Sequence, residues 1–172
     1  MGQLTYKFGT PIGIAGGIVD IAPYAIDTRK NEENNGNMLF GLGVVKGTSA
    51  GVQVKKPVAA STAGAFEGIT VNNLSTELDM DGKVRVLKGS PIGVMRYGRI
   101  YARVMDDITP AYGDPLYLVV TGDQAGYFTN VAATTGTNDA TYTSIAVKGR
   151  FLGTVDATNR IAPVELFNQA QA

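Results

Sequence analysis

Hydrophobic and polar residues alternate with a period of two along residues 83–105, KVRVLKGSPIGVMRYGRIYARVM. Near its end, Ile100, Ala102 and Val104 alternate with Arg99, Tyr101 and Arg103. Such alternation is typical of strands with one buried and one solvent-facing side. The segment carries six basic residues and no acidic residue. It therefore predicts two neighbouring β-strands with a cationic outer face.

The rest of the chain also has the pattern of an all-β protein. It contains 22 glycines and 7 prolines, which interrupt short runs rich in Val, Ile, Thr and Tyr, and no segment has the periodicity of an amphipathic helix. We predict a single β-barrel or sandwich-like domain. The expected strands cover residues 11–15, 39–46, 51–54, 66–71, 84–87, 91–95, 100–104, 115–120, 127–130, 146–154 and 162–167.

The first 35 residues mix apolar and turn residues without clean alternation. This composition favours an extended N-terminal arm, laid on a neighbouring chain, over a core element. We therefore divide the chain into an arm or interface segment, residues 1–35, and a β-rich domain, residues 36–172. Three polar stretches are expected to be less ordered because they bury little apolar surface: residues 28–37, 133–143 and the last five.

The composition excludes several classes of function. Fifteen basic residues balance fifteen acidic ones, so general attraction to nucleic acid or to an anionic membrane is not expected. The chain lacks cysteine and histidine, which removes thiolate or imidazole zinc sites and the histidine base of the common serine hydrolases. No export signal or lipid anchor is evident, and the longest apolar run, residues 12–21, is too short to span a membrane. We expect a soluble protein.

Two acidic pairs are candidates for chemical sites. Asp79 and Asp81 precede Gly82 in the manner of a calcium loop, but the glutamate that completes such a loop does not follow. Asp106 and Asp107 resemble paired acids at the exit of a strand. Turns explain both pairs better. Glycosidases use two carboxylates as catalytic groups, but no feature of the sequence marks any pair of its acidic residues for that role. We expect no enzyme activity and assign no catalytic residue, no metal site and no cofactor.

The basic strands themselves allow three interpretations. With Tyr97 and Tyr101 between the charges, they could stack the bases of a single-stranded nucleic acid. They could equally form a solvated face whose charges discourage edge pairing, or a surface that docks on an acidic protein. The first of these is not expected for a chain of zero net charge.

Short pieces spread over nearly the whole chain resemble the structural cement proteins of tailed-phage capsids. Each piece is common by itself, so the resemblance rests on the order and spacing of the pieces. They are Gly17, Asp20 and Ile26; NEE (31–33) with Gly36; FG (40–41) with VVKG (44–47); FEGITV (66–71); VRVL (84–87) with Gly89; GRI (98–100); GDPLY (113–117); GYF (126–128); GRFL (149–152); and APVEL (162–166).

The resemblance implies a non-enzymatic decoration protein of the virion, made in the host cytoplasm. It would bind the outer surface of an icosahedral head, usually as a homotrimer, and clamp neighbouring major capsid protein subunits. Membrane and nucleic acid would not be partners. Alternatives from other classes are a head–tail or tail-surface module and a glycan-binding or glycan-cleaving β-domain, although the lack of tryptophan disfavours a sugar platform.

Two contact surfaces follow from this reading. The first lies in residues 4–26, where apolar side chains would anchor the arm or the trimer contact. The second is a polar set that would steer the protein towards an acidic patch of the capsid. The anchors are Tyr6, Phe8, Ile12, Ile14 and Tyr24, and the polar set is Lys88, Arg96, Arg99 and Arg103.

Overall fold

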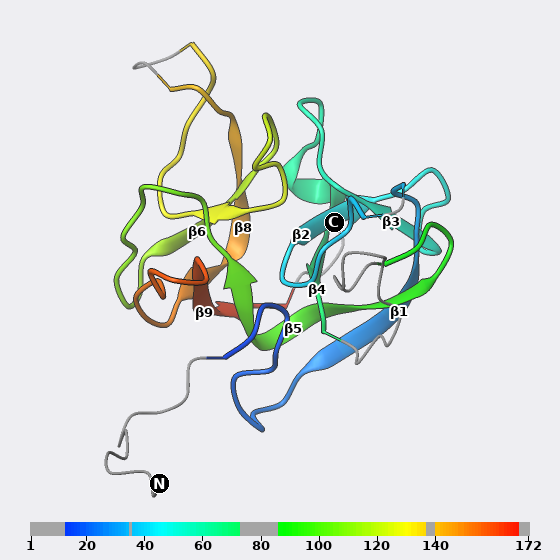
Figure 1. Ribbon diagram of the computed structural model, residues 1–172, viewed down its shortest axis with the longest axis horizontal. Coiled ribbons are helices and arrows are strands. Elements are labelled where there is room, and N and C mark those ends of the chain that lie inside the picture. The colour runs from blue at the N-terminus through cyan, green and yellow to red at the C-terminus, as the bar shows by residue number, and fades with distance from the viewer. Residues whose placement is uncertain (1–12, 35, 73–85, 137–139, 169–172) are drawn as a thin grey trace, which may run out of the picture.

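Strand β5 (Pro91–Arg103) connects the two halves of the protein (Figure 1). The computed structural model describes residues 13–34, 36–72, 86–136 and 140–168, and their regular structure is β apart from one short 3-10 helix, η1 (Ala63–Ala65). The other strands are β1 (Ala25–Asn31), β2 (Gly43–Lys46), β3 (Gln53–Lys55), β4 (Phe66–Thr70), β6 (Pro115–Val119), β7 (Phe128–Thr129), β8 (Ser144–Phe151) and β9 (Ile161–Leu166). The prediction of an all-β chain is confirmed.

The N-terminal half of β5 belongs to a closed ring of five strands. The order β1-β3-β2-β4-β5 closes on itself because β5 also pairs with β1. A closed ring leaves no free sheet edge for aggregation. The predicted barrel is therefore present, and its interior holds six buried side chains: Met38, Val44, Val54, Val86, Ile92 and Val94.

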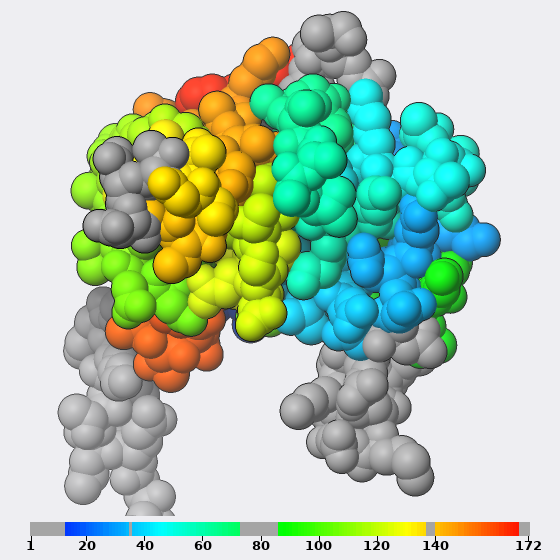
Figure 2. Space-filling view, turned by 90° about the horizontal axis from the view of Figure 1, so that it is seen from above, coloured from blue at the N-terminus to red at the C-terminus, as the bar shows by residue number. Residues whose placement is uncertain are grey.

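The C-terminal half of β5 begins a second layer, in the order β5-β9-β8-β6-β7. Its register with β9 runs from Gly98 opposite Leu166 to Arg103 opposite Ile161. A parallel bridge between Val104 and Phe128 brings β7 back to the end of β5. Seen from above, the N-terminal residues (blue to cyan) and the residues of β6 to β8 (yellow-green to orange) form opposite sides of the molecule (Figure 2).

The larger core cluster joins the two halves. It contains Phe66 and Met95 from the ring and Phe128, Phe151 and Leu166 from the second layer. The rings of Phe66 and Phe128 pack edge to face, with centroids 6.4 Å apart. This favourable aromatic geometry links β4 to β7, so we expect the two halves to unfold together.

Two charged residues sit at irregularities of neighbouring strands. On β4, Val44 pairs with Gly68 and Val45 with Phe66, which leaves Glu67 as the extra residue of a bulge. On β5, Arg96 is the extra residue opposite β1. Bulges of this kind re-aim a side chain out of the regular alternation.

Three differences from the expected strands have local causes. Residues 25–31, expected within the arm and partly in a less ordered stretch, form β1 in the ring, where Asn31 is buried and donates from its amide to Leu87 O at 3.1 Å. The strands expected at 91–95 and 100–104 are one continuous strand, because Gly98, at φ +122°, turns the chain without ending its pairing. Gly13, Ile14 and Ala15 are not in a strand, and neither are Val86 and Leu87; Pro11, Ile12 and residues 84–85 lie outside the described residues.

Candidate docking face

The outer side of β5, β9 and β8 is the surface that the sequence singles out. Its side chains alternate with buried ones along β5, where Ile100 and Ala102 are fully buried and Arg99, Tyr101 and Arg103 face outward. We call the outward residues of these three strands the docking face: Tyr97, Arg99, Tyr101 and Arg103 from β5, Glu165 and Phe167 from β9 and its end, and Lys148 and Arg150 from β8.

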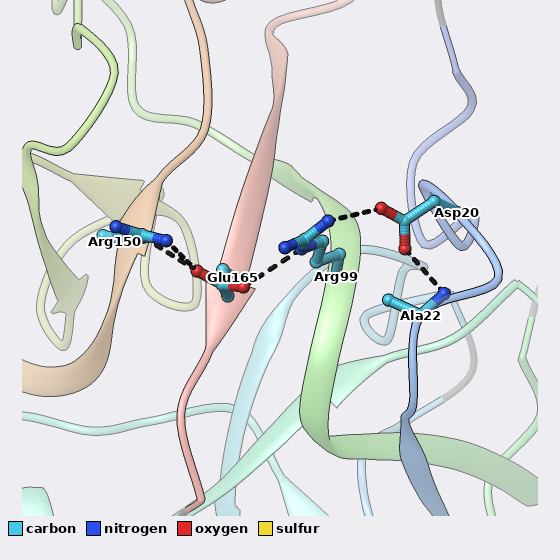
Figure 3. A network of polar contacts seen from close by, with 5 residues as sticks. All are labelled: Asp20, Ala22, Arg99, Arg150 and Glu165. Atoms are coloured by element: carbon cyan, nitrogen blue, oxygen red, sulfur yellow. Dashed lines mark hydrogen bonds and ion pairs between the residues drawn. The ribbon is translucent and has the colours of Figure 1, made fainter.

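A row of four charged side chains crosses the docking face (Figure 3). Arg99 Nη1 lies 2.7 Å from Asp20 Oδ2, and Arg99 Nε lies 3.0 Å from Glu165 Oε1. Arg150 approaches the other oxygen, Glu165 Oε2, at 2.7 Å. Asp20 also accepts a hydrogen bond from Ala22 N at 3.0 Å. Each arginine of the row is therefore matched by at least one carboxylate of the same chain.

These contacts shift the pKa values of the charged groups in the row. The hydrogen bond from Arg99, followed by that from Ala22 N, holds the pKa of Asp20 below its ordinary value. Burial by itself raises the pKa of Glu165, but the hydrogen bonds from Arg99 and Arg150 outweigh burial and lower it overall. The bonds to Asp20 and Glu165 raise the pKa of Arg99. Asp20, Glu165 and Arg99 are thus all charged at neutral pH.

Exposed aromatic side chains flank one end of this row. The guanidinium carbon of Arg150 lies 5.6 Å from the centre of the Tyr112 ring and 5.9 Å from that of Phe167, within cation–π range. Tyr112 is 69% exposed and Phe167 is 44% exposed. Tyrosine, phenylalanine and arginine are residue types that interfaces favour, so this end of the face is suited to protein contact.

The segment before β1 lies along the free side of β5. Gly16 N donates to Tyr101 O at 2.8 Å, and Tyr101 N donates to Gly17 O at 2.9 Å. Ile18 bridges to Ile100. Hydrogen bonds and one isolated bridge thus fix the backbone of the segment against β5, while several of its apolar side chains face solvent: Ile14 is 60%, Ile18 39%, Ile21 101% and Tyr24 51% exposed.

The structure places the predicted contact residues in different surroundings. Ile14 and Tyr24 are exposed on the segment before β1; Tyr6, Phe8 and Ile12 lie outside the described residues. Arg99 and Arg103 share the docking face, whereas Arg96 lies 3.4 Å from Asp27 and Lys88 Nζ lies 3.5 Å from Asn34 Oδ1. The four cations therefore do not form one continuous patch.

Sequence reasoning missed the acidic partners of this face. Asp20 comes from the segment before β1 and Glu165 from a strand 66 positions away from Arg99. Alternation within residues 161–166 could have placed Glu165 on an outer face, but only the strand order brings it opposite Arg99. The face is consequently a mixed ionic and aromatic surface and not a uniformly cationic one.

Two further findings concern other kinds of site. Within the described ranges, no three carboxylate side chains come together as a metal site would require. No helix in this same part of the chain has the length and hydropathy of a membrane span.

Comparison with known proteins identifies the fold first. A chain from the structure entitled "The capsid of Myoviridae Phage XM1" superposes with a TM-score of 0.69 and 17% sequence identity, over 94% of each chain. The two chains therefore share a fold. No curated protein matches the sequence.

The family follows from the sequence. Residues 2–167 match the family described as "Structural cement protein (E217 gp24/Pam3 gp6)". Because this match covers nearly all of the 172 residues, the chain belongs to the family of phage structural cement proteins. The resemblance seen in the short sequence pieces is confirmed.

Proposed function

We propose that this protein binds the outer surface of an assembled phage head and clamps neighbouring major capsid protein subunits, so that the shell resists internal pressure. The observation that carries the proposal is membership of the structural cement family over residues 2–167. The fold shared with a chain of a phage capsid structure supports it. The role is structural and involves no catalysis, and the protein reaches the head from the host cytoplasm.

Bridging explains how modest contacts stabilise a shell. Once one surface of the protein has bound a capsid subunit, contact with the next subunit is effectively intramolecular and costs far less entropy. A clamp therefore needs two separate surfaces. The end of the docking face at Arg150, Tyr112 and Phe167 and the exposed side chains of the segment before β1 are two such candidates on this chain, since both present apolar or aromatic side chains to solvent and the row of charges runs between them (Figure 3).

The N-terminal anchors act together in this proposal. Ile14 and Tyr24 stand exposed, and Tyr6, Phe8 and Ile12 precede them in the sequence. Apolar and aromatic anchors of this kind provide most of the energy of an interface when a partner covers them. Partners with extended negative charge, such as nucleic acid, are disfavoured because Arg99 and Arg150 already pair with Glu165.

We further propose that the protein acts as a homotrimer, which matches the local three-fold positions of an icosahedral shell. The mass of one chain is 18.1 kDa. Light scattering on the purified protein should give three times this mass, alone or after release from heads. A monomer or dimer in both preparations would reject the trimer but not the cement role.

The stabilising role has a direct test. Undecorated heads of the cognate phage, with and without added protein, are heated or subjected to osmotic shock, and intact heads are counted by electron microscopy. Added protein should raise the surviving fraction in a saturable way. Unchanged survival with protein visibly bound would contradict the clamp, and protein density on the tail or inside the head would contradict the proposed location.

A further inference from the structure

A small hollow of about 240 Å³ opens beside the C-terminal end of β5. Three segments line it: residues 13–15 ahead of β1, Arg103 at the end of β5, and Asn159 and Ile161 at the start of β9. The hollow is smaller than the roughly 300 Å³ at which sites for drug-sized ligands begin. Its size suits a single side chain of a partner.

Arg103 differs from the other arginines of the described residues. Arg29 and Arg96 pair with Asp27, Arg99 and Arg150 pair with Glu165, and Arg160 pairs with Asp106. Arg103 has no carboxylate partner among the described residues. Its Nε donates to Phe40 O at 2.9 Å, which fixes the guanidinium and leaves its two terminal nitrogens available.

The rest of the lining complements this cation. Asn159 Nδ2 donates to Asp156 Oδ2 at 2.7 Å, which holds the amide of Asn159 in place. Ile14, Ala15 and Ile161 supply apolar walls, and no acidic residue is among the lining residues. A fixed guanidinium between apolar walls matches the side chain of an aspartate or glutamate. The planar guanidinium can donate two parallel hydrogen bonds to the two carboxylate oxygens, and the apolar walls can contact the methylene groups.

We propose that this hollow receives the carboxylate of an aspartate or glutamate side chain of the major capsid protein. The inference rests on the proposed function and makes it specific: Arg103 is the point on the docking face where a charge of the partner is recognised. Ile14, 60% exposed at the rim, would be covered at the same time. Exclusion of water from the pair would strengthen it.

Binding to undecorated heads tests the proposal with three matched variants. Arg103→Gln removes the charge and should weaken binding about ten- to hundredfold, the range for a charge-assisted hydrogen-bonded contact. Ile14→Glu puts a negative charge at the rim without disturbing a buried residue, and should weaken binding similarly even if Arg103→Gln folds poorly. Lys30→Gln removes one positive charge from an exposed site on β1 and should stay within about twofold of wild type.

The outcomes separate this inference from the function on which it rests. If wild-type protein binds heads and Arg103→Gln binds equally well, the carboxylate site is rejected and the cement role stands. Equal weakening by Arg103→Gln and Lys30→Gln would show that only total charge matters, which also rejects the site. If wild-type protein does not bind heads at all, the proposed function fails.

A second measurement does not need heads. N-acetylglutamic acid amide, added at millimolar concentration to ¹⁵N-labelled protein, should shift the amide signals of Gly13, Ala15 and Ile161. The uncharged N-acetylglutamine amide and the Arg103→Gln variant should give no such shift. Absence of a shift in the wild-type protein would overturn the proposal. A shift that appears only after residues 169–172 are removed would also overturn it, because the chain's own carboxyl terminus would then be the occupant of the hollow.

Discussion

The backbones of Gly16 and Gly41 are in close contact where the segment before β1 meets the ends of β4 and β5. A Cβ atom on Gly16 would come within 3.0 Å of Gly41 N, and one on Gly41 would come within 2.9 Å of Gly16 N. Both residues have positive φ, +77° and +76°. Gly16 N bonds to Tyr101 O and Gly41 N to Thr70 O, each at 2.8 Å, so the contact sets the position of the whole segment.

The change Gly16→Ala should therefore loosen the segment that carries Ile14 and Ile18. We expect it to lower the free energy of unfolding by about 3 kcal/mol or more, from left-handed backbone strain together with overpacking. Gly51→Ala is the matched control, because Gly51 has nearly the same φ, +76°, and nothing within 4 Å of its Cβ position. It should cost only about 1–2 kcal/mol. Denaturant unfolding measures both, and equal losses would contradict the close contact.

The charged row on the docking face predicts a dependence of stability on pH. Asp20 and Glu165 have pKa values below their ordinary 3.8 and 4.5. A depressed pKa in the folded protein contributes stability above the ordinary value, and this is lost as the pH falls through the lower, folded value. The melting temperature should therefore fall as the pH drops below about 4.5.

Glu165→Gln provides the comparison for this effect. The variant should melt at a lower temperature than wild type at pH 7, and the gap should shrink on acidification because wild type loses the same interaction. Glu33→Gln, which removes a carboxylate from a different part of the chain, is the control. A gap of constant size between pH 7 and pH 3 would contradict the role given to Glu165.

Glu67 is a buried carboxylate whose charge the fold compensates poorly. It is 2% exposed, its Oε2 lies 3.9 Å from Arg29 Nη2, and neither carboxylate oxygen accepts a hydrogen bond from a described residue. Burying a charge costs free energy unless the charge is paired and hydrogen-bonded. Glu67→Gln should thus raise the free energy of unfolding by about 1 kcal/mol, since Arg29 keeps Asp27 as its partner. A loss of stability would show that the charge is well compensated.

Phe128 holds the second layer closed. It is fully buried, bridges to Val104, and packs edge to face on Phe66. Phe128→Ala should lower the free energy of unfolding by about 3–5 kcal/mol through lost burial and the remaining cavity. Val131→Ala, at a position 50% exposed, should change it by less than about 0.5 kcal/mol. Separate melting of the two halves in either protein would contradict their shared core.

Local patterns in the sequence predicted most strands but not their closure. Short apolar runs bounded by turn residues located β4, β6 and β9 to within a residue or two, because each strand is mostly buried, β4 at all five of its positions. β1 was missed because its residues, AIDTRKN, are polar and partly exposed; it is a strand through its pairing with β3 and β5. Pairing between distant segments cannot be read from a local pattern.

The same limit applies to the candidate site. Arg99 and Arg103 were placed correctly on an outward face because period-two alternation depends only on neighbouring residues. Their different surroundings were not predicted: Arg99 meets Asp20 and Glu165, while among the described residues Arg103 bonds to the backbone carbonyl of Phe40 and to no carboxylate. That difference arises from the strand order, and it is the reason we propose separate roles for the two arginines.

Co-sedimentation with undecorated heads tests the central claim most directly. Purified protein is mixed with heads assembled from the cognate major capsid protein and, in parallel, with free subunits of the same protein. Because clamping requires neighbouring subunits, saturable binding to heads and little binding to free subunits is the predicted result. No binding to heads, or equal binding to free subunits, would contradict the account.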